Sequence, residues 1–350
     1  MMTDWNKIEK VNNDILIDSK KRWDSIAKPI EGLGRMEELI TRIAGAQNRV
    51  DADISKKAVL VFCADNGVVK QHISQVDSSV TANIVRSIQG GTSSVAVMAK
   101  SAGADVFVYD VGVLTDEEGV INCKLMYGTD DISEGPAMSR DVAIDTIETG
   151  ITAITRLKEE GYKLVATGEA GIGNTTTSAA IAGALLGLDA SVVTGRGSGL
   201  TNNGYFHKID IVSKSWEVNG IGREQVDTID VIARVGGLDI AALTGAYLGA
   251  AMNHMPVIMD GIISAVAALC AFTINEDVKD YIIPSHMSME PAMVKICERL
   301  GLEPVIHANM HLGEGTGAVL LMPMLDTAMA VYNSGTTFDK IDVKQYERLK

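Results

Sequence analysis

The chain has 350 residues, of which 46% are hydrophobic, 22% charged and 5% aromatic. This composition predicts a folded protein with a large aliphatic core and excludes extensive disorder. The formal net charge of −14 disfavours binding to nucleic acid or to an anionic membrane surface, so we expect a small-molecule partner. The four cysteines form no CxxC pair, no secretory signal precedes Ser25, and the longest apolar run, 261–274, is too short for a membrane span. The sequence predicts a soluble, cytoplasmic protein.

The first fifty residues are polar, with apolar residues at helical spacing and interruptions at 28–29 and 32–34, and they predict a helical arm. From Ala58 onward, short apolar runs alternate with helical stretches. Continuous apolar runs of this length are typical of parallel strands that are covered on both faces. We expect strands at 58–67, 104–112, 163–169, 256–261 and 280–286, and helices at 93–102, 140–160, 175–186, 238–251, 262–271, 290–300 and 317–332.

This alternation predicts an α/β fold built on a doubly wound, mainly parallel sheet. In such sheets ligands bind beyond the carboxyl ends of the strands. The polar residues expected at these ends are Asp65, Asp110, Glu169, Asp260 and Ser285. A polar tail follows the last helix, and we expect it to pack on the N-terminal arm as a second, smaller layer.

A glycine-rich loop at 167–177, Thr-Gly-Glu-Ala-Gly-Ile-Gly-Asn-Thr-Thr-Thr, joins a predicted strand to a predicted helix. Exposed amides at a helix N-terminus favour an anion, and the hydroxyls of Thr175 and Thr176 add hydrogen bonds to a phosphate. The alternative interpretation is a structural turn whose threonines cap the helix. The chain contains no Gly-Lys dipeptide and no complete G-x-G-x-x-G, so ATP and dinucleotides lose support.

A second glycine-rich loop, Thr-Gly-Arg-Gly-Ser-Gly at 194–199, precedes a polar stretch that contains Lys208. Its glycines let the backbone approach a ligand closely, and Arg196 or Lys208 could neutralise a phosphate. The alternative interpretation is a flexible connector.

The segment His-Leu-Gly-Glu-Gly-Thr-Gly at 311–317 places Glu314 between glycines immediately before an apolar helix. Glu314 is either a general base held where the backbone leaves room for a substrate, or a carboxylate that complements the helix N-terminus. A third hypothesis is a metal-dependent hydrolase, because His307 and His311 have the i, i+4 spacing of a metal pair and Glu314 lies nearby. Leu312 and Gly313 favour a loop here, and no further ligand cluster is visible, so we expect no metal.

With these motifs in view, the chain resembles the nicotinate-nucleotide–dimethylbenzimidazole phosphoribosyltransferase (CobT) family. Ordered matches extend from about residue 28 to 330 and include KPIEGLGRMEEL, EGPAMSR, GEAGIGNTTTSAAI, TGRGSG, GGLDIAALTGAYLGAA, PVIMDG, SHMSMEPA and HLGEGTGA. The resemblance implies a Rossmann-like large domain at 51–329, a small helical domain formed by 1–50 with 330–350, and a homodimer.

The resemblance also implies the reaction. The phosphoribosyl group of nicotinate mononucleotide passes to an aromatic base that becomes a cobamide lower ligand, which gives an α-ribotide and releases nicotinate. Glu314 matches the general base of the family, and Glu169 matches a second active-site carboxylate. The residues that match elements holding the ribose phosphate are Gly171, Gly173, Asn174, Thr175, Thr176, Gly197, Lys208 and, less closely, Ser288.

The chemistry agrees with this set of residues. Nicotinate is bonded through a pyridinium nitrogen, so it leaves as a neutral ring and needs no general acid. One base suffices: Glu314 removes the proton of the incoming azole or phenol as its nucleophilic atom attacks C1 of the ribose, and neighbouring carboxylates stabilise oxocarbenium character. The reaction needs no metal and no nucleotide cofactor.

The chain departs from the family pattern in segment 64–85, which in the family lines the base pocket. The family has Asp-His-Gly where this chain has Asp-Asn-Gly at 65–67, Glu-Gly-Val-Ser where it has Gln-His-Ile-Ser at 71–74, and glutamine where it has Asn83. The acceptor therefore need not be dimethylbenzimidazole alone; adenine, other benzimidazoles and phenols such as p-cresol are the nearest alternatives, and the sequence does not identify the base. The residues that we expect at the base are Asn66, Gln75, Asn83 and Leu312.

Some relatives work as paired paralogues. Two alternatives therefore stay open: a heterodimer with a paralogue, and a non-catalytic, auxiliary subunit of such a pair. The presence of Glu314 and of the whole 167–177 loop argues against a silent subunit, because such a subunit has no chemical reason to keep both.

Overall fold

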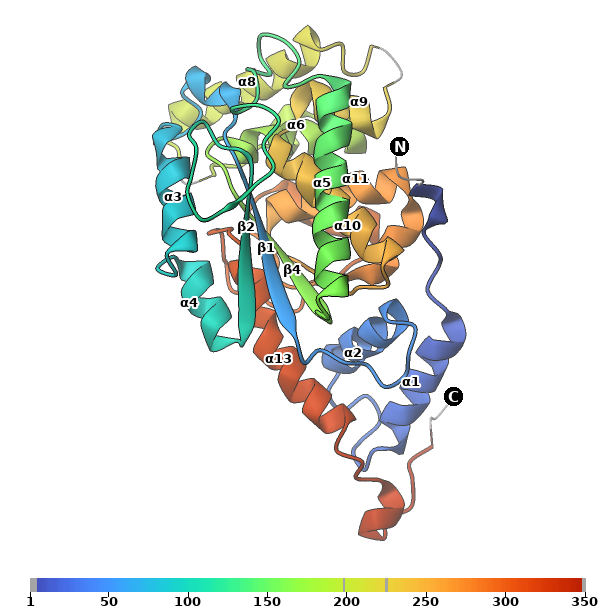
Figure 1. Cartoon of the computed structure of the whole chain (residues 1–350). Helices are drawn as coiled ribbons and strands as arrows, with labels where there is room; N and C mark the ends of the chain where they lie inside the picture. Colours follow the sequence, from blue (N-terminus) through green and yellow to red (C-terminus); the bar gives the residue numbers. More distant parts are fainter. Residues whose placement is uncertain (1–4, 198, 224–225, 348–350) are drawn as a thin grey trace.

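The computed structural model describes residues 5–197, 199–223 and 226–347. At its centre lies a six-stranded, wholly parallel sheet with the strand order β3-β2-β1-β4-β5-β6, which is the Rossmann order. Helices cover both faces of the sheet (Figure 1), so the predicted α/β, doubly wound, Rossmann-like fold is confirmed. The strands are β1 Lys57–Ala64, β2 Ala104–Gly112, β3 Ile121–Asn122, β4 Leu164–Ala170, β5 Val257–Met259 and β6 Ile282–Pro284.

All five predicted strands are present, and the two-residue β3 is the strand that the sequence did not reveal. The predicted helices are present with small shifts at their ends. Helices α3, α7, α8 and α9 were not predicted. The helices are α1 Asn13–Ser25, α2 Arg35–Ala46, α3 Ser79–Gln89, α4 Ser94–Ser101, α5 Arg140–Glu159, α6 Asn174–Leu186, α7 Ala190–Val193, α8 Asn202–Val218, α9 Thr228–Val235, α10 Leu238–Met252, α11 Ile262–Ile274, α12 Ala292–Leu300 and α13 Thr316–Tyr332.

Successive residues of β1 enter two different cores, because side chains alternate across a strand. Leu60 and Phe62 join the core that α5, α6, α10 and α11 form on one face of the sheet. Val59 and Val61 join the core that α2, α4 and α13 form on the other face. Every residue of β1 is buried, and after Lys57 the strand is an unbroken apolar run.

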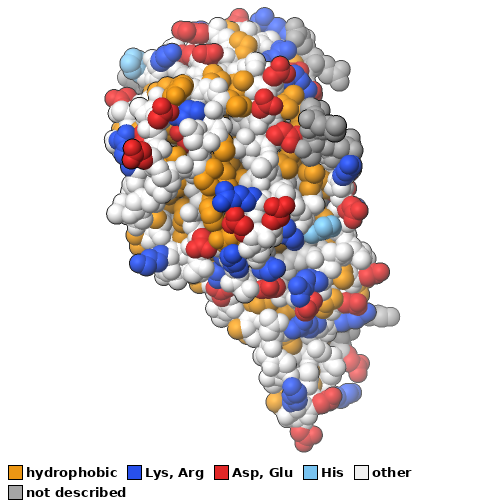
Figure 2. All heavy atoms as spheres, viewed as in Figure 1, with side chains coloured by type: hydrophobic (Ala, Val, Ile, Leu, Met, Phe, Trp, Pro, Cys, Tyr) orange, Lys and Arg blue, Asp and Glu red, His pale blue; other side chains and the backbone are white. Residues whose placement is uncertain are grey.

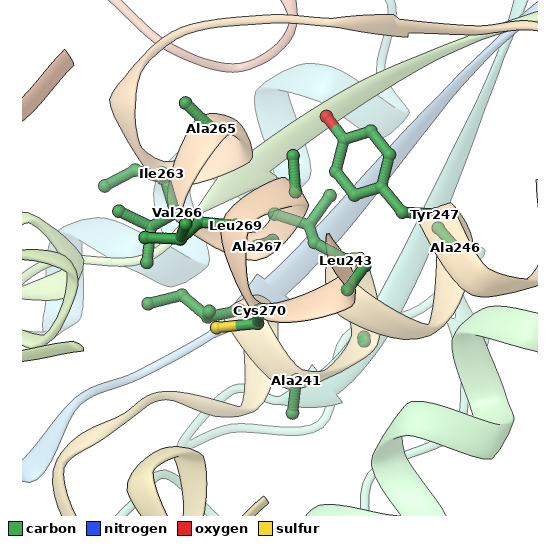
Figure 3. Packing of buried hydrophobic residues seen from close by; sticks show 14 of the residues in the cluster. Ala241, Leu243, Ala246, Tyr247, Ile263, Ala265, Val266, Ala267, Leu269 and Cys270 are labelled. Carbon is green, nitrogen blue, oxygen red and sulfur yellow. The ribbon is translucent and has the colours of Figure 1, made fainter. Parts of the chain in front are cut away.

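Helix α10 lies against α5 at a separation that only glycine permits. A Cβ atom on Gly245 would collide with the backbone oxygen of Ile147, and one on Gly150 would collide with the backbone oxygen of Ala242. On another side, α10 packs against α11 through small and aliphatic side chains (Figure 3). The three helices form a dense layer on one face of the sheet.

The strand order reverses between β1 and β4. Strands β2 and β3 are added on one side of β1, and β4, β5 and β6 are added on the other side. Ligands of such sheets bind where the order reverses, beyond the carboxyl ends of the strands. The five polar residues predicted at this edge are there: Asp110 and Glu169 lie near the ends of β2 and β4, and Asp65, Asp260 and Ser285 directly follow β1, β5 and β6.

The N-terminal helices α1 and α2 and the C-terminal end of α13 lie together at the lower end of the molecule in Figure 1. The Ser19 hydroxyl of α1 lies 2.9 Å from the Tyr332 hydroxyl, the Arg22 guanidinium lies 4.2 Å from the centre of the Tyr332 ring, and Ile26 pairs with Thr337. The tail therefore packs on the N-terminal arm. One hydrophobic core joins these helices to the sheet, and the division into domains at 1–50 with 330–350 and at 51–329 stays a prediction.

On the face that Figure 2 shows, charged side chains of both signs are scattered over the lower end of the molecule. Hydrophobic side chains gather in the middle of its upper part. Among the exposed large apolar side chains, Leu114 lies between β2 and β3, and Leu125 and Tyr127 lie between β3 and α5. In the part of the chain that the structure describes, none of the helices has both the length and the hydropathy to cross a bilayer.

Candidate active site

A pocket opens at the carboxyl edge of the sheet, where the loops after β4, β5 and β6 meet the start of α13. Its empty space is about 1000 Å³, which includes open solvent at the mouth. The lining residues are Ile73, Ser74, Ile84, 169–175, Arg196, Gly197, 260–264, His286, Ser288, Glu290 and 311–314.

The predicted glycine-rich loop forms one wall of this pocket. Gly173, the residue before α6, has φ 95°, and a Cβ atom on Gly171 would collide with the backbone oxygen of Ala64. The loop therefore needs glycine at both positions. Thr175 lines the pocket, whereas Thr176 is fully buried with its hydroxyl unpartnered and is not among the lining residues.

Lys208 is a buried cation behind the pocket, next to the lining residues Thr175 and Gly197, and is not itself a lining residue. Helix α8 carries it under the second glycine-rich loop, where its Nζ donates to the Thr175 hydroxyl at 2.7 Å and the side chain is 1% exposed. Among the described residues no carboxylate lies within ion-pair distance of this Nζ. Burial lowers the pKa of Lys208 to about 8, and the charge of Glu290 opposes that shift. A buried ammonium without an ion-pair partner indicates a site for an anion.

The second glycine-rich loop is held by Glu290, one of whose carboxylate oxygens accepts a hydrogen bond from the Gly197 amide at 3.0 Å. Gly197 has φ 54°, and a Cβ atom there would lie 3.0 Å from the Thr175 hydroxyl and 3.4 Å from Lys208 Nζ. Arg196 lines the pocket, but its guanidinium donates to the Leu200 carbonyl and to the Asn202 side chain of the same loop. Ser198 lies outside the described residues.

Glu314 stands at the turn into α13, and the turn requires positive φ angles. They are 85° at Gly313, 60° at Glu314 and 93° at Gly315. One carboxylate oxygen of Glu314, Oε2, is buried without a hydrogen-bond partner, and burial raises the pKa of Glu314 above its ordinary value. These properties suit a general base.

Glu169 lies beside Glu314, and its Oε1 accepts the Glu314 backbone amide at 3.4 Å. The Asn174 side-chain amide bridges Glu169 Oε2 to Asp239 Oδ2, the latter at 2.9 Å. Burial, and after it the charge of Asp239, raises the pKa of Glu169 to about 8. Burial also raises the pKa of Asp239. The two carboxylates and the amide therefore form a buried polar network at the end of β4.

Asp260 connects the end of β5 to the start of α13. Its carboxylate accepts the Gly315 amide at 3.2 Å and the Ala318 amide at 2.9 Å, and His286 Nε2 lies 3.7 Å from it. These contacts cap the helix and hold the turn that carries Glu314.

The structure brings only part of the predicted base contacts to the pocket. Leu312 lines it, together with Ile73, Ser74 and Ile84, which the sequence did not single out. Ser288, the less certain phosphoribosyl contact, also lines it.

The other three predicted base contacts do not line the pocket. Asn66 is buried beneath the glycine-rich loop and donates to the Ile172 carbonyl at 3.2 Å. Gln75 and Asn83 are exposed, and the Asn83 side-chain oxygen accepts a hydrogen bond from Arg86. The prediction placed Asn83 in the pocket because it treated segment 64–85 as one lining strip. In fact α3 turns Asn83 outward and its neighbour Ile84 inward.

The metal-site hypothesis finds no supporting geometry. His307 and His311 lie in an irregular segment, so their i, i+4 spacing does not place them on one helix face, and His307 is exposed. Within the described ranges no three His, Cys, Asp or Glu side chains are grouped so that they could hold a metal ion.

Besides Ile73, Ser74 and Ile84, three ionisable residues at the site were not predicted from the sequence, namely Asp239, His286 and Glu290. Each lies in a motif that carried the resemblance, but nothing in its spacing assigned it a role. Asp239 had the clearest signal, because it is a charged residue at the start of the otherwise apolar α10.

Comparisons with known proteins agree with this geometry. A family model described as a phosphoribosyltransferase matches residues 8–343. The nicotinate-nucleotide–dimethylbenzimidazole phosphoribosyltransferase of Ruminiclostridium cellulolyticum is 43% identical over 347 residues, 99% of this chain and 98% of that protein. The protein of the same name from Clostridium acetobutylicum is 42% identical over 345 residues, 98% and 97% of the two chains. The chain belongs to this phosphoribosyltransferase family.

Solved structures give the same family. The crystal structure of CobT from Thermus thermophilus superposes on this chain with a TM-score of 0.89 at 34% sequence identity. The superposition covers 95% of this chain and 100% of the Thermus chain. The predicted CobT family membership is therefore confirmed. As a member of the CobT family, the chain is an enzyme that transfers a phosphoribosyl group.

The protonation of Lys208 should control anion binding. Sulfate keeps its charge over the range of this test, whereas Lys208 loses its proton above about pH 8, so we expect sulfate to bind about tenfold more weakly at about pH 9 than at about pH 7. Titration calorimetry measures both affinities. Lys208→Arg keeps its charge and should remove the pH dependence. Equal wild-type affinity at the two pH values would contradict the assignment.

Glu169 should lower the stability of the fold at alkaline pH. Its pKa in the folded protein is raised, so the folded state binds the proton more tightly, and stability is lost as pH rises from about 4.5 toward about 8. Glu169→Gln stays neutral and should raise the melting temperature by a few degrees at about pH 8 but not at about pH 4.5. Glu118→Gln, an exposed substitution, is the control. An unchanged or lower melting temperature for Glu169→Gln at about pH 8 would show that the folded protein stabilises the ionised Glu169 carboxylate, which would contradict the prediction.

Proposed function

We propose that this enzyme transfers the 5-phosphoribosyl group of nicotinate mononucleotide to a cobamide lower-ligand base. The base is dimethylbenzimidazole or a related azole or phenol, and the products are nicotinate and an α-ribotide. One observation carries the proposal: a single pocket is lined both by Thr175, whose hydroxyl binds the buried Lys208 ammonium, and by Glu314, a carboxylate with one unpartnered oxygen. The names of the relatives support the same substrates.

The anion site takes the 5-phosphate. Thr175 and Lys208 supply donors, and the N-terminus of α6 adds the positive end of its dipole. Phosphate also supplies the negative charge that the buried ammonium lacks. The phosphate end of the nucleotide is therefore fixed by charge as well as by hydrogen bonds.

Glu314 takes the proton of the acceptor while its nucleophilic atom attacks C1 of the ribose. The C1–N bond to the pyridinium breaks with its electron pair going to nitrogen, so nicotinate leaves as a neutral ring. Attack on the face opposite to the leaving group inverts C1, and a β-nucleotide becomes an α-ribotide. The neighbouring carboxyl groups of Glu169 and Asp260 stabilise the positive charge that develops on the sugar.

The acceptor wall is mainly apolar, with Ile73, Ile84 and Leu312 lining it. Such a wall suits a flat aromatic ring. Ser74 adds a hydroxyl beside it, which both donates and accepts and so does not separate an azole from a phenol. The proposal therefore covers several acceptors of similar size.

Two assembly states are part of the proposal, a homodimer and a heterodimer with a paralogue. The exposed Leu114, Leu125 and Tyr127, which flank β3 in the chain, support a surface that a second chain covers. Light scattering of the purified protein separates both states from a monomer. We also propose a cytoplasmic location, which cell fractionation tests.

Glu314→Gln removes the base and nearly preserves its shape. Turnover should fall by roughly 10²–10⁴, while the affinity for nicotinate mononucleotide changes little. The measurement is nicotinate release at saturating acceptor, with a parallel binding titration and Glu118→Gln as the exposed control. Turnover of Glu314→Gln close to wild type would reject Glu314 as the base, and with it the proposed mechanism.

Ile84 and Asn83 are neighbours that point in opposite directions, so they form a matched pair for testing the acceptor wall. In a competition among dimethylbenzimidazole, adenine, phenol and p-cresol, Ile84→Ala should change the ratio of ribotide products by about tenfold, because it enlarges the pocket. Asn83→Gln should leave the ratio unchanged. Mass spectrometry of the products decides. The wall is misassigned if Asn83→Gln alone shifts the ratio.

A further inference from the structure

Two carboxylates fix the orientation of the Asn174 side chain. Its Nδ2 atom donates to Glu169 Oε2 and to Asp239 Oδ2. A primary amide nitrogen has two hydrogens, and both are used here. The ionised carboxylate of Asp239 only accepts hydrogen bonds, so the amide nitrogen must face it, and Glu169 Oε2 contacts that same nitrogen. The amide therefore has one favourable orientation rather than two.

This orientation leaves the Asn174 oxygen as the end of the amide that is open to a ligand. Asn174 lines the pocket, and its Oδ1 accepts no hydrogen bond from the described residues. It is also absent from the buried polar atoms that lack a partner. Asn174 thus offers the pocket an acceptor and no donor.

The position of Asn174 indicates which part of a nucleotide it meets. Its side chain contacts Glu169, which in turn contacts the Glu314 amide, whereas the next residue, Thr175, contacts Lys208. Asn174 therefore lies between the acceptor end of the pocket and the anion end. The middle of a nucleotide is its sugar, and the sugar hydroxyls can donate, whereas a phosphate or a carboxylate would be repelled by a bare oxygen.

We propose that Asn174 Oδ1 accepts a hydrogen bond from a ring hydroxyl of the substrate ribose, and that Asp239 is a positioning residue that holds the amide in this orientation. The inference rests on the proposed function for the identity of the sugar. It adds a specificity: the site discriminates ribose from deoxyribose through an acceptor whose direction is set by a residue outside the pocket.

Asp239 is built for this positioning role. It is fully buried at the start of α10 and does not line the pocket. One of its oxygens, Oδ1, accepts the Ile240 amide at 3.0 Å, which leaves Oδ2 directed at Asn174. Without this second acceptor, one amide hydrogen of Asn174 loses its partner and the side chain is free to rotate.

Binding of ribose 5-phosphate and of its 2-deoxy and 3-deoxy analogues tests the proposal without depending on catalysis. By calorimetry, the wild type should prefer ribose over one of the two analogues by about three- to tenfold, the contribution of one hydrogen bond. Asn174→Ala should abolish that preference. Asn219→Ala is the matched control, since it removes another buried amide, which donates to the carbonyls of Ile132 and Ser215, and should keep the preference.

The Asp239 variants separate positioning from a merely structural role. Asp239→Ala should lose most of the preference, and Asp239→Asn should restore it only in part, because its single carbonyl oxygen cannot accept from both the Asn174 side chain and the Ile240 amide. A structural role would lower the melting temperature of Asp239→Ala and leave the preference intact. The inference is overturned if the wild type shows no preference or if Asn174→Ala keeps it.

Nicotinate release by the wild type is measured in parallel, so that the two proposals fail separately. A ribose preference that depends on Asn174 supports this inference even if nicotinate mononucleotide is not turned over, and then only the proposed function fails. Turnover without that preference overturns this inference alone.

Discussion

A parallel sheet brings the polar ends of all its strands to one edge, and here the chain reverses its direction along the sheet at β1 and β4. The reversal separates the loops on the two sides of β1 and leaves room between them. The glycine-rich loop after β4 and the turn before α13 then face the same pocket. Asp65 and Asp110 lie at the same edge but hold the backbone after β2. Their carboxylates accept hydrogen bonds from the amides of Leu114 and Val113, respectively.

The pocket and its surroundings contain buried ionisable groups whose charged forms the protein itself stabilises poorly. Lys208 is buried without a carboxylate at ion-pair distance, within the limits of the described residues, and burial raises the pKa values of Glu169, Asp239 and Glu314. A phosphate supplies the missing anion, and a sugar that becomes cationic in the transition state supplies the missing positive charge. The substrate thus completes an arrangement that destabilises the empty fold, which is a common relation between stability and activity.

The sequence predicted the sheet, its order of elements and the edge where ligands bind, because apolar runs covered on both faces have a clear pattern. It also singled out Glu169, Glu314 and the glycine-rich loop, which the structure brings to one pocket, while their roles stay a proposal. It did not predict Asp239 or Glu290, since each acts through a contact with a residue distant in the chain. It misplaced Asn83, because α3 was not predicted. Adjacent residues of a helix point in different directions, so Asn83 is exposed while the next residue, Ile84, lines the pocket.

Coupling between acceptor and leaving group tests the central claim most directly. The purified enzyme is incubated with nicotinate mononucleotide, with and without an aromatic base, and nicotinate and ribotide are counted together by mass spectrometry. The account predicts that nicotinate appears only when a base is present and in equal amount to an α-ribotide. Nicotinate release to water without a base, or none with any base, would contradict phosphoribosyl transfer from this pocket.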